Sequence, residues 1–172
     1  MAKRHPRTLS SGANSTVIAL GKTEKLFHGD TRSDIGSEAE KLRYANGVNG
    51  LVARFVRLDM DEQLDVDMLV MERLYPTDFR AYEQERCERW LSVSEDELDV
   101  LHRAGFVHRH LRRPSHMPGM RYDNILLTTT GLRLIDVGIS ALRDKVGDRL
   151  FGRFVKRERE ELDAFRQFFL TR

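Results

Sequence analysis

Cysteine, proline and long apolar stretches are scarce in this sequence of 172 residues. The single cysteine, Cys87, cannot form a disulfide within the chain, so nothing in the sequence requires an oxidising compartment. Four prolines and twelve glycines are too few for a collagen-like or low-complexity protein. No apolar run approaches the roughly 20 residues that cross a bilayer, and the charged residues 1–7 lack the apolar core of a Sec-type signal peptide. We therefore expect a soluble, cytoplasmic protein with no membrane span.

A large excess of one charge is also absent. The 29 Lys and Arg residues against 27 Asp and Glu residues give a formal net charge of +2, a balance that does not indicate a nucleic-acid-binding protein. About 40% of the residues are apolar, and a chain of this length can bury roughly 70% of the surface that its unfolded form exposes. The composition therefore predicts one globular domain without a nucleic-acid partner.

Local patterns in the first half of the chain alternate between strands and a helix. β-branched and apolar runs predict two or three short strands over residues 8–27, and further strands over 51–58 and 67–71. Between them, residues 33–46 fit a helix that Gly47 ends, and the acidic residues 59–67 fit a turn.

The second half contains helices and one hairpin. Residues 77–90 are charged and fit a helix, and Ser94 with Glu97 forms a capping-box pattern that starts another helix, which should end at Gly105. Two apolar runs around residues 128–131 predict a hairpin, and a last helix places Val155, Leu162, Phe165 and Phe169 on one face. The order of these elements predicts the α+β class.

Four stretches carry polar groups that this pattern does not require. The small residues of loop 10–16 let backbone N–H groups approach an anion such as a phosphate. Lys25 lies within a predicted strand, and Glu38 lies on the helix that follows. Asn124 and Asp136 lie at the two ends of the predicted hairpin, where their oxygens can converge on Mg²⁺ and phosphate oxygens.

Taken together, these stretches resemble the protein-kinase family. Residues 105–109 (Gly-Phe-Val-His-Arg), then 123–127 (Asp-Asn-Ile-Leu-Leu) and 135–138 (Ile-Asp-Val-Gly), are similar to the catalytic loop, the strand after it and the metal-binding turn, with Val in place of the usual Phe. The resemblance covers roughly residues 8–145. It implies a two-lobed kinase-like fold, with an N-lobe over 8–73 and a strongly reduced C-lobe over 74–172.

The same resemblance assigns the remaining site residues and the cofactors, which are ATP and Mg²⁺ or Mn²⁺. A reduced glycine-rich loop over the phosphates would include Gly12, Ser15 and Val17, and Lys25 would hold the phosphates with Glu38 as its helix partner, or Glu40 if the helix register differs. Met71 would be the gatekeeper, with Glu72 and Leu74 offering backbone groups to adenine, while Asn124 and Asp136 would bind the metal.

Two departures from the family pattern bear on activity. Only 34 residues follow Gly138, without an Ala-Pro-Glu sequence, so the chain looks like the minimal bacterial kinases that are injected into host cells as effectors. His110 stands where the family has the aspartate that accepts the hydroxyl proton, and residues 111–122 form an insertion before Asn124. A neutral imidazole can accept a proton, since its ordinary pKa is about 6.5, and Asp123 is an alternative acceptor.

The expected function is therefore that of a minimal Ser/Thr, or Tyr, protein kinase acting on an unidentified protein of its own cell or of a host. A nucleotide-binding pseudokinase and a small-molecule kinase remain alternatives. His108, His110 and His116 could instead bind zinc, although no cysteine or carboxylate lies at a ligand spacing beside them. A basic cluster is either a solvated face or a docking site for an acidic substrate or a phosphate-bearing partner; it consists of Arg109, Arg112, Arg113 and Arg121.

Overall fold

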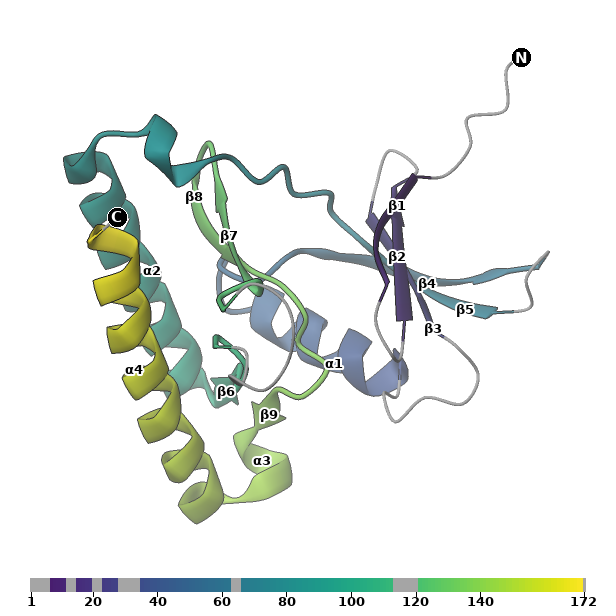
Figure 1. The fold of residues 1–172 in the computed structure, drawn as a ribbon. Helices are drawn as coiled ribbons and strands as arrows, with labels where there is room; N and C mark the ends of the chain where they lie inside the picture. Colours follow the sequence, from purple (N-terminus) through teal and green to yellow (C-terminus); the bar gives the residue numbers. More distant parts are fainter. Residues whose placement is uncertain are drawn as a thin grey trace.

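The computed structural model describes residues 7–11, 15–19, 23–27, 35–62, 66–112 and 121–171, with side chains from residue 37 onward apart from those of 61, 66 and 79. The fold mixes helices and small sheets, which confirms the predicted α+β class. Its N-terminal part is an antiparallel sheet in the order β1-β2-β3-β5-β4 (Figure 1). These strands are β1 (Arg7–Ser11), β2 (Ser15–Ala19), β3 (Thr23–Phe27), β4 (Phe55–Asp61) and β5 (Val66–Met71).

Helix α1 (Ile35–Asn46) packs against this sheet. Its buried Ala39 and Leu42 share one core cluster with Leu69 and Met71 of β5. The helix ends where Gly47 follows, as predicted. The strand predicted over 51–58 begins only at Phe55, because residues 51–53 pair with β8 instead of the sheet: the N–H of Ala53 donates to the carbonyl of Leu134 at 2.8 Å.

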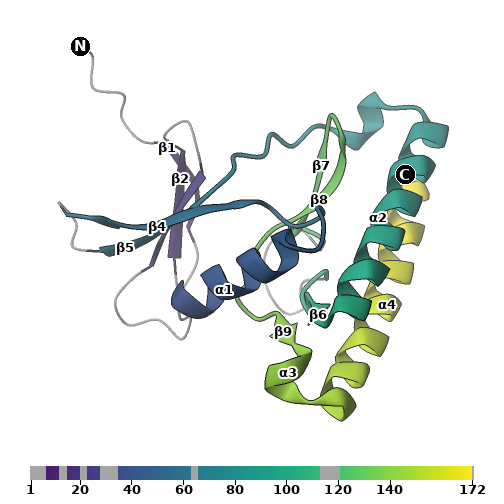
Figure 2. The ribbon, with the colours of Figure 1, turned by 180° about the vertical axis from the view of Figure 1, so that it is seen from behind.

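Two long helices form the other end of the molecule. α2 (Gln84–Ala104), which follows the short 3-10 turn η1 (Phe79–Ala81), packs along α4 (Asp148–Leu170), as both views show (Figure 1, Figure 2). The predicted end of α2 at Gly105 is confirmed, because Gly105 has a φ of 102° that favours glycine. The prediction that a helix starts at Ser94 is wrong. Ser94 is buried within α2, and its hydroxyl donates to the carbonyl of Trp90 at 2.8 Å.

Short strands and one turn of helix lie between the sheet and the long helices. The predicted hairpin is confirmed as β7 (Ile125–Thr128) and β8 (Gly131–Leu134). β6 (Phe106–Val107) pairs with β9 (Ala141–Leu142), which leads into α3 (Arg143–Val146). In Figure 1 this hairpin and α1 stand between the sheet and the helix pair.

A second core cluster joins the helix pair to the hairpin. Phe165 and Phe169 of α4 are buried there with Leu127 of β7 and Leu132 of β8, while Leu162 packs at its edge. The predicted apolar face of the last helix is thus confirmed, since Val155 also packs against a third cluster that contains Val107, Ala141 and Phe151. No helix in the described part of the chain has a stretch long and apolar enough to cross a membrane.

Candidate functional site

The turn that contains Asp136 is held from three elements. The carbonyl of Ile135 accepts a hydrogen bond from Nε2 of His108 at 2.9 Å, and the N–H of Ile135 donates to the carbonyl of Asn124 at 3.0 Å. Nζ of Lys41 on α1 donates to the carbonyl of Gly138 at 2.7 Å. Asp136 itself has a φ of 61°, a left-handed conformation that Asp tolerates better than most residues. The surroundings therefore fix where its carboxylate is presented.

Glu38 of α1 lies beside this turn. Its side chain is only 1% exposed, and its Oε2 lies 3.5 Å from the point that a Cβ on Gly138 would occupy. Oδ1 of Asp136 lies 3.6 Å from that same point, so a side chain at residue 138 would touch both carboxylates. Glu40, the alternative inward residue, is instead exposed and lies 3.5 Å from Nζ of Lys145. The structure therefore directs Glu38, and not Glu40, toward the turn.

Asn124 links the start of the hairpin to His110. Its Nδ2 donates to the carbonyl of His110 at 2.8 Å and lies 3.0 Å from Nδ1 of the same residue. A carbonyl can only accept, so the amide nitrogen must face His110, and Nδ1 must accept as well. A neutral His110 ring then carries its proton on Nε2 and acts outward as a donor. Oδ1 of Asn124 accepts no hydrogen bond from any described residue, which makes it the atom of Asn124 that could bind a metal.

His108 is a buried, neutral residue. Burial in the first place lowers the pKa of its imidazole, against the nearby charges of Glu158 and Asp136, which raise it. Because the carbonyl of Ile135 accepts from Nε2, the ring proton lies on that atom. His108 therefore ties the segment 108–110 to the residue before Asp136.

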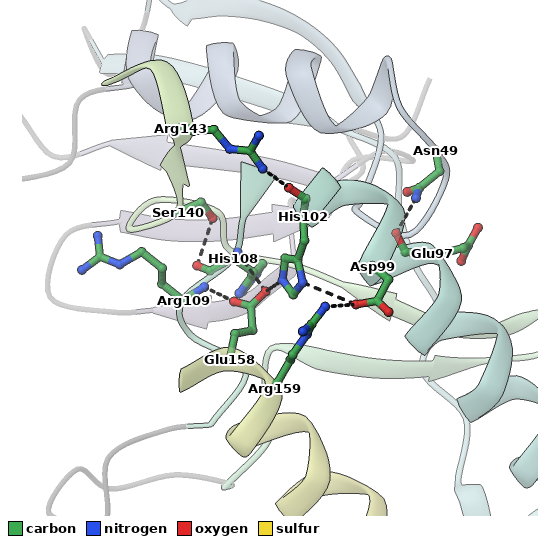
Figure 3. A network of polar contacts seen from close by, with 10 residues as sticks. All are labelled: Asn49, Glu97, Asp99, His102, His108, Arg109, Ser140, Arg143, Glu158 and Arg159. Carbon is green, nitrogen blue, oxygen red and sulfur yellow. Dashed lines mark hydrogen bonds and ion pairs between the residues drawn. The ribbon is translucent and has the colours of Figure 1, made fainter. Parts of the chain in front are cut away.

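Glu158 of α4 is a site residue that the sequence analysis missed (Figure 3). Residues around it fit an exposed helix face, yet Glu158 is only 1% exposed. Its Oε1 lies 2.9 Å from Nε2 of His102 and accepts from the N–H of His108 at 3.2 Å, while Oε2 accepts from the N–H of Arg109. The sequence does hold a sign of this burial. Glu158 lies seven residues after Phe151 and four before Leu162, which is the helical spacing of the buried face of α4.

Arg109 packs across the C-terminal helix. It has a φ of 70°, its guanidinium carbon lies 3.9 Å from the centre of the Phe154 ring, and its Nη1 donates to the carbonyl of Ile139 at 3.0 Å. Burial, and next the positive charge of Arg157, lower the pKa of Arg109. The segment 108–110 is thus held by its backbone N–H groups at Glu158, by the His108 ring at the Ile135 carbonyl and by the Arg109 guanidinium at Phe154.

The residues expected near the adenine base lie at the end of β5 and just after it. Met71 is buried, Leu74 is half-buried, and Glu72 accepts from the N–H of Arg54 at 2.7 Å and pairs with Arg133 of β8. The side chain of Glu72 therefore anchors the segment after β5 to the hairpin.

The residues expected around the phosphates are placed only by their backbone. Lys25 of β3 lies opposite Val17 of β2 and Leu69 of β5, Ser15 begins β2, and Gly12 falls outside the described residues. Asp123 is half-buried beside Asn124. The structure thus brings Glu38, Lys41 and the Asp136 turn together, with Asn124 and His110 next to them, and leaves the pairing of Lys25 a prediction.

The donor set at Asn124 and Asp136 suits one kind of metal. An amide oxygen and a carboxylate are hard ligands of the type that Mg²⁺ takes, a few at a time, alongside phosphate oxygens. Among the described residues no group of three His, Cys, Asp or Glu side chains is arranged to hold a metal, and His116 of the predicted zinc set lies outside them.

No model of a known protein family matches the chain, and no curated protein matches it either. Its chemistry is therefore inferred from its own residues.

Proposed function

We propose that the chain is an ATP-dependent phosphotransferase with a kinase-like, two-lobed arrangement, which moves the γ-phosphate of ATP to a Ser, Thr or Tyr hydroxyl of another protein. The observation that carries this proposal is that the carboxylates of Glu38 from α1 and of Asp136 both lie beside Gly138, next to Asn124 and His110. Motifs separated by about a hundred residues along the chain thus come together around one turn.

A protein catalyses phosphoryl transfer mainly by positioning the reactants and by neutralising phosphate charge. Oδ1 of Asn124 and the carboxylate of Asp136 would hold Mg²⁺, which supplies that neutralisation when it is bound. Lys25, on the sheet next to α1, would hold the phosphates while Glu38 fixes the lysine. Gly12, Ser15 and Val17 would cover the phosphates, and backbone groups at Glu72 and Leu74 would meet adenine behind Met71.

His110 would face the acceptor hydroxyl as a hydrogen-bond donor. Its Nδ1 lone pair accepts from Asn124, so the neutral ring has no second lone pair with which to take the hydroxyl proton. General-base assistance is typically worth about 10²–10⁴-fold in rate, and the loose transition state of phosphoryl transfer depends on it little. We therefore propose real but slow transfer.

The test is transfer of labelled γ-phosphate from ATP with Mg²⁺ or Mn²⁺, with the protein itself and a mixed cell lysate as acceptors. Asp136→Asn should abolish labelling because it weakens the metal site. Asp144→Asn, which changes an exposed carboxylate of α3, should label like the wild type. Equal labelling by wild type and Asp136→Asn would contradict the proposal.

A pseudokinase is the second candidate, and the orientation of Asn124 toward His110 is the observation that favours it, because it takes up the lone pair of His110 and leaves Asp123 as the alternative proton acceptor. It predicts that ATP raises the melting temperature while no label is transferred. A small-molecule kinase would instead give ATP turnover that a metabolite stimulates, with no labelled protein.

A further inference from the structure

Two basic clefts have Arg109 in their walls and lie beside the residues that follow the Asp136 turn. The first has a volume of about 300 Å³ and lies between α4 and the segment 109–112, with Arg109, Arg112 and Arg157 in its wall. The second has a volume of about 540 Å³ and lies between α1 and residues 140–146, with Lys41, Arg109 and Lys145 in its wall. Arg109 lines both, so the two clefts adjoin at this residue, and we refer to the pair as the basic path.

The carboxylates in these walls are already occupied. Glu158 is buried and accepts from the backbone at residues 108 and 109. Glu161 lies 3.2 Å from Nε of Arg157 and accepts from the N–H of Arg112 at 3.3 Å, and Glu40 lies 3.5 Å from Lys145. Each guanidinium carries five N–H donors, so these contacts leave donors of Arg112 and Arg157 available to a ligand.

The cations along this path also repel one another. Arg157 is 74% exposed in its side chain and opposes the charge of Arg109 across the first cleft, which is one reason that the pKa of Arg109 is lowered. An anion placed between the two guanidinium groups would relieve this repulsion and satisfy their donors. The path therefore favours a negatively charged occupant.

The shape favours an extended occupant over a small ion. The two clefts together reach from α1 to α4, and the first is also lined by Ile139, which is 51% exposed, and by the ring of Phe154. A polypeptide can place carboxylates in both clefts and an apolar side chain against Ile139, which a single anion cannot do. His110 borders the first cleft, so a peptide bound there would reach the residue that faces the acceptor hydroxyl.

We propose that the two clefts bind an acidic, Asp- and Glu-rich segment of the protein substrate and so select acceptor hydroxyls that are flanked by carboxylates. The assignment of this segment to a phosphoryl acceptor rests on the proposed function, whereas the binding of the acidic segment does not.

The binding test needs no ATP. A labelled peptide of about ten residues, with one Ser among Glu and Asp, is titrated with the full chain by fluorescence anisotropy, beside the same peptide with Gln and Asn. We expect the acidic peptide to bind at least about tenfold more tightly, and high salt to remove the difference. Arg157→Ala should weaken binding about fivefold, while Arg153→Ala, an exposed residue of α4 outside both clefts, should not.

The outcomes separate this proposal from the proposed function. Equal affinity for the acidic and neutral peptides, or an equal effect of Arg153→Ala and Arg157→Ala, would overturn the acidic site. A phosphoserine peptide that binds more than about tenfold more tightly than the Glu/Asp peptide would overturn the choice of carboxylates. Selective acidic binding without phosphate transfer would uphold the site and overturn the phosphotransferase.

If transfer occurs, steady-state kinetics give a second readout. Arg157→Ala should raise KM for the acidic peptide about fivefold at unchanged kcat, because the residue binds the flanking segment and does not touch the reacting atoms. A fall in kcat without a change in KM would contradict the assignment.

Discussion

Among single residues, His110 bears most directly on how the proposed phosphate transfer could take place. Asn124 presents its amide nitrogen both to the His110 carbonyl and to Nδ1, which fixes the ring as an acceptor on one side and a donor on the other. The sequence suggested that this imidazole accepts the hydroxyl proton. Because its Nδ1 accepts from Asn124, we propose that it positions the acceptor hydroxyl by donating from Nε2 instead.

The first prediction concerns His110→Asp. An aspartate there can accept from the Asn124 amide with one oxygen and from the substrate hydroxyl with the other, so phosphate transfer should rise about tenfold to a hundredfold. Single-turnover transfer rates measure this. His110→Asn is the matched control without a charge and should give no increase. A rate in His110→Asp no higher than in His110→Asn would show that the missing acceptor does not limit transfer.

The second prediction concerns His108 and pH. Burial lowers its folded-state pKa, so below pH 6.5 the unfolded chain takes up a proton that the folded chain does not. Stability should therefore fall as the pH drops from 7.5 to 5.5, and this residue should account for about 1 kcal/mol of the loss. Urea unfolding of wild type and His108→Gln at both pH values isolates it. The same pH dependence in both proteins would contradict the assignment.

Among the helices, α4 anchors the segment 108–110 through one buried carboxylate, that of Glu158 (Figure 3). Glu158 satisfies two backbone N–H groups and contacts His102 of α2, so it joins two helices and the loop. The last helix thus holds the backbone at His108 and Arg109, directly before His110, as well as covering the core.

Replacing Glu158 should therefore be costly. Glu158→Ala leaves buried N–H groups without acceptors, and we expect a loss of about 3 kcal/mol in the free energy of unfolding, with a smaller loss of about 1–2 kcal/mol for Glu158→Gln. Urea denaturation provides the values. Glu160→Gln, an exposed position two residues along the helix, should change stability by less than about 0.5 kcal/mol. Similar values for residues 158 and 160 would refute the anchoring role.

The ends of helices and strands could be predicted from the sequence where neighbouring residues alone determine them. Gly105 ends α2 and residues 128–131 turn the hairpin, because both depend on backbone conformations that a few neighbouring residues decide. The role of Ser94 could not be predicted in this way, because its hydroxyl donates to the carbonyl four residues back, and no local sequence pattern distinguishes such a serine from an N-cap.

For the molecule as a whole, α1 and the Asp136 turn form the central junction. One core cluster runs from α1 and β5 to α2 and β8, and Lys41 and Glu38 reach the turn across it. Residue types at the candidate site could be predicted from motif order. The roles of Lys41 and Glu158 could not, because charged side chains on helices usually face water and only tertiary packing buries them.

The most direct test of this account is the Mg²⁺ dependence of ATP binding, measured by titration calorimetry. We predict that Mg²⁺ strengthens ATP binding in the wild type and in Asp144→Asn. In Asp136→Asn the ratio of ATP affinities with and without Mg²⁺ should be at least about tenfold smaller, because one of the two protein ligands of the metal is weakened. Glu38→Gln should weaken ATP binding with or without the metal. If Asp136→Asn retains the full Mg²⁺ effect, the residues around the Asp136 turn do not form a nucleotide site and the account is wrong.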